Sequence, residues 1–152
     1  MGQAFFYHLT DSTLEETPPM LIGKARGAGW RVVVRGPDAA MLDALDAALW
    51  LGPEEAFLAH GRAGGPHDAL QQVLLCAPDQ AAEAQCLMCV AGAGVTAEEA
   101  ARLERLCILF DGHDEAAKAH ARGQWKALTG AGIAGQYWAQ EGGRWVKKAA
   151  SE

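Results

Sequence analysis

Three short segments of the chain consist of apolar residues with no polar residue among them. They are Val73-Leu74-Leu75-Cys76, Cys86 to Val90, and Leu106 to Phe110. A strand that is exposed to water on one face alternates apolar and polar side chains, because successive side chains point to opposite faces. Uninterrupted apolar strands are instead typical of a parallel sheet that helices cover on both faces. These segments therefore predict an α/β fold whose central sheet is buried on both sides.

Helical segments are expected between the strands. Asp38 is a favoured N-cap residue, and apolar residues at helical spacing follow it, namely Met41, Leu42, Leu45, Ala48 and Leu49. Thr96-Ala97-Glu98-Glu99 is a capping box, which predicts a helix that continues to about Arg105. A longer helix is expected from about Asp114 to Leu128. The alternation of strands and helices predicts a single domain of three layers, α/β/α, with a mostly parallel sheet.

The chain length of 152 residues suits one domain. We expect this domain to span residues 1–132 and a polar, aromatic extension to span residues 133–152. Within the extension, Trp138 and Trp145 either flank a hairpin turn at Glu141-Gly142-Gly143 or stay loose until a partner binds. The sequence leaves both possibilities open.

The net charge of the chain is −6 at pH 7. Proteins that bind nucleic acid through its phosphates need a surplus of Lys and Arg, and proteins of the membrane surface need basic clusters. The charge therefore argues against direct binding to nucleic acid or to a membrane. The first residues, MGQAFFYHLTD, have neither the basic nor the apolar region of a secretory signal, so we expect a cytoplasmic protein.

Cys86 and Cys89 have the C-x-x-C spacing of many metal and redox sites. They lie in an apolar run that is predicted to be a strand, where residues three apart point to opposite faces. Two such thiolates could not bind one metal ion. The cysteines are therefore interpreted as small buried apolar residues, and no metal site is expected.

The turn from Gly92 to Ala97 fits the G-x-G-x-x-A pattern of dinucleotide-binding proteins, and Asp111 follows after one helix and one strand. This pattern supports an alternative function, a small dinucleotide-binding enzyme that uses the Gly92 and Gly94 turn. Glu98 and Glu99 argue against it, because they would lie in the first turn of the helix and repel a bound pyrophosphate. A tight turn is the favoured interpretation.

Other catalytic patterns are missing from the sequence. The only serines are Ser12 and Ser151, and neither a G-x-S-x-G, a Walker-type nor an H-E-x-x-H motif occurs. No residue set predicts an enzyme, and no catalytic residue is proposed.

The helix that begins near Asp114 carries Lys118, Arg122 and Lys126 at successive i, i+4 steps. On a helical projection, Trp125 lies within about 60° of Lys118 and Arg122, beside an apolar stripe that would face the core. Such a surface could receive an acidic peptide with an apolar end. The other interpretation, a solvated basic stripe with the tryptophan ring in the core, stays open.

Trp50 and Phe57 lie around the predicted end of another helix. Two large aromatic side chains at such a place either complete the core or form a patch for a protein partner. The residues alone do not decide between these two possibilities.

Three segments together resemble the chi subunit family of bacterial DNA polymerase III. The first is Phe6-Tyr7-His8-Leu9, and the second is Leu42 to Trp50, followed by Phe57-Leu58-Ala59-His60, which resembles the family's L-D-x-x-L-W helix and later P-H pair. The third, Ala121-Arg122-Gly123-Gln124-Trp125-Lys126, resembles the family's A-R-x-x-[YW]-K. These matches span most of residues 4–130.

The chain departs from the family pattern at three positions. Ala59 stands where proline is usual, Gly123 interrupts the basic helix, and Thr129 replaces a basic residue that some members carry. The last two departures weaken the expected basic surface.

The resemblance implies a Rossmann-like fold, no cofactor, and a non-catalytic accessory subunit. Members link the clamp-loader complex to single-stranded DNA-binding protein by holding its acidic C-terminal tail, which ends in a phenylalanine carboxylate. On this chain, Lys118, Arg122 and Lys126 would contact the tail carboxylates, and Trp125 would line the site of the final ring. Trp50 and Phe57 are the candidates for the surface that faces the psi subunit or an equivalent partner.

Overall fold

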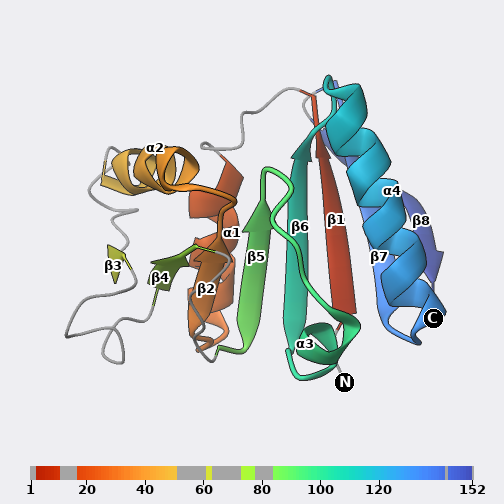
Figure 1. Ribbon diagram of the computed structural model, residues 1–152, viewed down its shortest axis with the longest axis horizontal. Coiled ribbons are helices and arrows are strands. Elements are labelled where there is room, and N and C mark those ends of the chain that lie inside the picture. Colours follow the sequence, from red (N-terminus) through yellow and green to blue (C-terminus); the bar gives the residue numbers. More distant parts are fainter. Residues whose placement is uncertain are drawn as a thin grey trace.

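A computed structural model describes residues 3–10, 17–50, 61–62, 73–77, 84–142 and 144–151 of the chain. It contains one eight-stranded sheet with the strand order β3-β4-β2-β5-β6-β1-β7-β8 (Figure 1). The strands are β1 (Gln3–Leu9), β2 (Val32–Arg35), β3 (Gly61–Arg62), β4 (Val73–Cys76), β5 (Cys86–Val90), β6 (Arg105–Asp111), β7 (Ala134–Glu141) and β8 (Arg144–Ser151). The helices are α1 (Thr17–Gly27), α2 (Ala39–Trp50), α3 (Ala97–Ala101) and α4 (Glu115–Gly130).

All neighbouring strands pair in parallel except β7 and β8, which are antiparallel. The three uninterrupted apolar runs form β4, β5 and most of β6, and their apolar side chains are buried. The prediction of a single-domain α/β fold with a mostly parallel sheet is confirmed. The closer likeness to a Rossmann fold stays a prediction.

Two separate apolar clusters lie on the two faces of the sheet, which gives the molecule three layers. One cluster contains residues of α1 and α2, such as Ile22 and Leu45, and the other contains residues of α3 and α4, such as Ala100 and Leu128. Cys86 belongs to the first cluster and Cys89 to the second, so the two thiols lie on opposite faces, as the strand geometry predicts.

The predicted helix starts are confirmed at the level of individual hydrogen bonds. The carboxylate of Asp38 accepts a hydrogen bond from the backbone N–H of Met41 at 2.9 Å, and the carboxylate of Asp114 accepts one from Ala116 at 2.9 Å. Thr96 forms the complete capping box with Glu99. Each cap satisfies amide groups that have no partner within the helix.

The prediction that α3 continues to about Arg105 is wrong, because α3 ends at Ala101 and Arg105 begins β6. The backbone N–H groups of Glu104 and Arg105 donate to the carbonyl of Gln85 at 2.8 and 3.1 Å. These bonds connect the segment to the start of β5, so sheet formation prevails over the local preference for helix.

The C-terminal segment forms the hairpin that was one of the two possibilities for Trp138 and Trp145. Strands β7 and β8 pair from Gly135 and Ser151 to Glu141 and Arg144, and Gly142 has a positive φ of 58° in the turn. Strand β7 also pairs with β1. Residues 134–151 therefore extend the same sheet as the rest of the chain.

Glycine is required at the end of β6, where the backbone approaches β1 closely. A Cβ atom at position 112 would overlap the ring of His8 and lie 2.7 Å from the carbonyl oxygen of Leu9, whereas a Cβ at Gly123 would meet no atom within 4 Å. We expect Gly112→Ala to lower the free energy of unfolding by about 1–3 kcal/mol, as overpacking does. Urea denaturation measures this change.

The matched control is Gly123→Ala on the exposed face of α4. Alanine is favoured over glycine in a helix interior by about 1 kcal/mol, so this variant should be more stable than the parent chain. Equal effects of the two substitutions would contradict the assigned close contact at Gly112.

Candidate functional site

Helix α4 lies across the β1–β7 side of the sheet, where it contacts β6 and β7 (Figure 1). Its buried residues are Ala121 and Leu128, and Ala117 is partly buried against the same cluster. The predicted apolar stripe therefore faces the sheet, and the remaining faces of α4 carry the candidate binding residues.

The three predicted cations differ in their surroundings. Lys118 pairs with Glu115 at 2.7 Å, and its side chain is only 23% exposed. Arg122 and Lys126 are exposed, and they form no ion pair within the described part of the chain. Exposed cations without an intramolecular counter-ion attract anions from solution, so Arg122 and Lys126 are both available to a carboxylate.

Trp125 is partly buried and packs its ring against the core. The ring meets Phe6 edge-on at a centroid distance of 5.3 Å and Tyr137 at 6.3 Å. Gly135 lies directly beneath it, since a Cβ at that position would be 2.9 Å from the Trp125 ring. The ring therefore packs on the core, as one of the two sequence interpretations expects, and its part in a binding surface stays a prediction.

Two residues that were not predicted as site residues complete this surface. Nδ1 of His8 and the hydroxyl of Tyr137 are hydrogen-bonded at 2.8 Å, and the ring of Phe110 lies 5.1 Å from His8 and 6.0 Å from Tyr137. The period-2 alternation of β1 places His8 on the same face as Phe6. Tyr137 could not have been found, because its hydrogen bond to His8 joins residues 129 positions apart and arises only through the pairing of β1 with β7.

The positive charges of α4 act on these aromatic residues. The pKa of His8 lies below its ordinary value, chiefly because burial disfavours the imidazolium and further because Lys118, His113 and Arg122 repel it. Burial raises the pKa of Tyr137, and Arg122 opposes that change. Lys118 and Arg122 of α4 therefore lie near enough to His8 to act electrostatically on its imidazole.

The second predicted surface is not described by the structure. Trp50 is the last residue of α2, but its side chain lies outside the described part, and so does Phe57. Their role at a partner interface stays a prediction.

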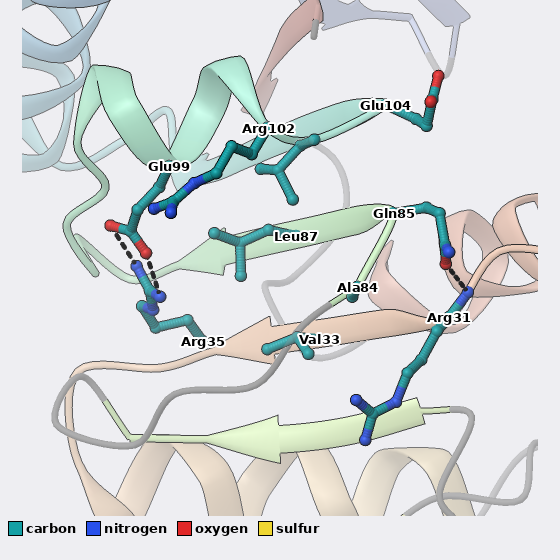
Figure 2. A pocket seen from close by; sticks show the side chains of 10 residues that line it. Arg31, Val33, Arg35, Ala84, Gln85, Leu87, Glu99, Arg102 and Glu104 are labelled. Atoms are coloured by element: carbon teal, nitrogen blue, oxygen red, sulfur yellow. Dashed lines mark hydrogen bonds and ion pairs between the residues drawn. The ribbon is translucent and has the colours of Figure 1, made fainter. Parts of the chain in front are cut away.

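The glycine turn after β5 is occupied by the chain's own carboxylate. Glu99 accepts hydrogen bonds from Arg35 at 2.7 and 3.3 Å and from the backbone N–H of Thr96 at 3.2 Å. Figure 2 shows the Arg35 and Glu99 side chains pointing toward one another at the edge of a cavity of about 880 Å³. Arg35 holds the pKa of the Glu99 carboxyl below its ordinary value, so the carboxylate stays charged.

This arrangement disfavours a pyrophosphate at the Gly92 and Gly94 turn. A negative charge already lies at the start of α3, and this helix is only five residues long. Asp111, the acidic residue of the pattern, instead accepts a hydrogen bond from the backbone N–H of His113 at 2.9 Å. No observation at this turn favours the dinucleotide-binding alternative.

These features define an α/β protein with a cationic, aromatic helix face, which stays a candidate binding surface. The family model of the DNA polymerase III chi subunit, HolC, matches residues 1–136, and the chain belongs to this family. It is therefore an accessory subunit of DNA polymerase III, from a non-catalytic family, and acts in DNA replication. No curated protein matched the chain. The described helices include none that is long and apolar enough to cross a membrane.

The lowered pKa of His8 gives a pH-dependent test of the site. The unfolded chain binds a proton at this residue more readily than the folded chain, so His8 contributes stability above its ordinary pKa of about 6.5 that is lost as the pH falls. We expect an NMR titration of the imidazole to give a midpoint below 6.5. Replacing Lys118 and Arg122 by glutamine should raise that midpoint only part of the way, because burial is the largest cause.

Lys126→Gln is the control, since Lys126 is not among the charges that act on His8. A midpoint at or above 6.5 in the parent chain would show that the described environment of His8 is wrong.

Proposed function

We propose that the chain links the clamp-loader complex of DNA polymerase III to single-stranded DNA-binding protein by binding that protein's acidic C-terminal tail. The observation that carries the proposal is the exposed Arg122 beside the partly buried ring of Trp125. A tail that ends in a phenylalanine carboxylate matches both features, because the guanidinium can form paired hydrogen bonds with a carboxylate and the aromatic ring can contact the terminal ring.

The other two cations extend the surface along α4. Lys126 lies one helical turn from Arg122 and is exposed, so it can contact acidic residues that precede the terminal phenylalanine. Lys118 first has to exchange Glu115 for a tail carboxylate. This exchange costs little, because Glu115 is exposed and surface ion pairs contribute little to stability.

The chain reaches DNA indirectly in this proposal. Its net charge of −6 disfavours contact with phosphates, whereas an acidic tail needs only a local cluster of cations. We infer a cytoplasmic location, no direct binding to nucleic acid or to a membrane, and a psi subunit or equivalent partner that contacts Trp50 and Phe57.

The first test is calorimetric titration with an acidic peptide that ends in phenylalanine with a free carboxylate. We expect weak binding that decreases with salt, because few charge pairs supply the contact. Arg122→Ala should weaken binding at least tenfold, as the loss of a hydrogen bond between charged groups does, with little change in thermal stability.

Arg102→Ala is the matched control, because Arg102 is also an exposed arginine and follows α3 rather than lying on α4. Its affinity for the peptide should equal that of the parent chain. Full affinity in Arg122→Ala would overturn the assignment of the site.

The second test concerns the position of the Trp125 ring. Gly135→Ala places a methyl group 2.9 Å from the ring and forces it outward. We expect the Trp125 indole signal to shift and the affinity for the peptide to fall severalfold. A peptide whose terminal phenylalanine is replaced by alanine should lose little further affinity in this variant, because its contact with the ring is already missing.

A further inference from the structure

A second cavity lies on the face of the sheet opposite to α4. Its volume is about 230 Å³. Residues from α1 and the sheet form an apolar base, namely Leu21, Ala25, Cys86, Met88 and Cys107. Four aromatic residues also line it, namely Phe5 and Tyr7 of β1, Trp138 of β7 and Trp145 of β8. We call this cavity the hairpin pocket, because the β7–β8 hairpin provides its two tryptophans.

The aromatic rings of the hairpin pocket pack on one another. Tyr7 and Trp145 meet edge-on at a centroid distance of 5.3 Å, and Phe5 lies 6.4 Å from Tyr7. The indole N–H of Trp138 donates to Gln136 at 3.1 Å. These contacts fix the side chains before any ligand arrives, which reduces the entropy cost of binding.

Arg105 lines the hairpin pocket and has an unused hydrogen-bond donor. The centre of its guanidinium lies 4.4 Å from the ring centroid of Phe5 and 5.2 Å from that of Trp30. Its Nε atom is buried and finds no acceptor within the described part of the chain. The stacked guanidinium group as a whole places a positive charge at the wall of the pocket.

A second cation, Lys24 of α1, lines the same cavity and is exposed. Among the residues that the structure describes, no carboxylate lines the cavity. The hairpin pocket therefore combines an apolar interior with positive charge, although the chain as a whole is acidic. This local charge is complementary to a carboxylate.

The size and chemistry of the pocket select one kind of ligand. Cavities for drug-sized molecules measure roughly 300–1,000 Å³, so this one suits a single large side chain. Its base offers apolar groups and thiols, which would leave the polar edges of a nucleobase without good partners. An aromatic hydrocarbon side chain has no polar edge, so its burial leaves no hydrogen-bonding group without a partner.

We propose that the hairpin pocket docks one aromatic side chain of a protein partner, with an adjacent carboxylate bound by Arg105 and Lys24. The contact is independent of the proposed tail-binding surface, because the two lie on opposite faces of the sheet. It also gives a role to Trp138 and Trp145.

The test uses the full chain and the blocked tripeptide Glu-Phe-Glu, acetylated and amidated so that no terminal carboxylate is present. NMR follows the Nε–H of Arg105 and the indole N–H signals of Trp138 and Trp145, while the indole signal of Trp125 reports on the other face. We expect saturable shifts at the first three signals. The same shifts should persist in Arg122→Ala, so failure of the tail-binding proposal would leave this result intact.

Two comparison peptides separate the ring from the charge. Lys-Phe-Lys and Glu-Ala-Glu, blocked in the same way, should each bind at least fivefold more weakly. Equal binding of Lys-Phe-Lys would overturn the role of the two cations. Shifts produced by short oligothymidylate but not by Glu-Phe-Glu would replace the proposal with a nucleic-acid site.

Variants of the cations complete the experiment. Lys24→Glu changes an exposed residue and should lower the affinity for Glu-Phe-Glu at least fivefold. A folded Arg105→Gln variant should show the same loss of affinity. Arg102→Glu is the matched control, because it reverses the charge of another exposed residue, next to α3 on the other side of the sheet. It should change the affinity for Glu-Phe-Glu by no more than twofold. Unchanged affinity in Lys24→Glu, or no shift at the three signals in the parent chain, would refute the hairpin pocket as a docking site.

Discussion

The pairing of β1 between β6 and β7 is the interaction on which both candidate surfaces depend. This strand pairs in parallel with β6 along its whole length and with β7 over six residues. Its alternate side chains serve different faces: Phe6 and His8 support the surface beside α4, and Phe5 and Tyr7 line the hairpin pocket. A slip of one residue in this register would exchange the two sets and remove both surfaces at once.

The net charge of the chain and the local charge of the two candidate surfaces have opposite signs. The net charge of −6 argues against a broad phosphate-binding face, yet it does not describe the potential at Arg122 or at Arg105. The guanidinium of Arg105 lies over aromatic rings, and Arg122 lies three residues before Trp125 on α4. In each place a carboxylate could be bound while an apolar group packs beside it. Local placement of a few cations therefore determines the class of ligand more closely than the overall charge does.

The parts of the fold that depend on neighbouring residues could be predicted from the sequence. Uninterrupted apolar runs identified the buried strands, and Asp38, Thr96 and Asp114 identified helix starts, because a cap is a contact within three residues. Strand pairing joins distant residues, so the contact of His8 with Tyr137 had no local signal. The end of α3 was missed for the same reason, since the bonds from Glu104 and Arg105 go to Gln85 on another element.

The aromatic residues of the C-terminal hairpin lie just beyond the segment that matches the chi family model. The match ends at residue 136, one position before Tyr137 and two before Trp138. Tyr137 contributes to the surface beside α4, whereas Trp138 and Trp145 line the hairpin pocket. Strand β7 pairs directly with β1, so residues inside and outside the matched segment lie on adjacent strands. The hairpin pocket therefore combines residues from inside and outside the matched segment, since Phe5 and Tyr7 precede residue 136 and Trp138 and Trp145 follow it.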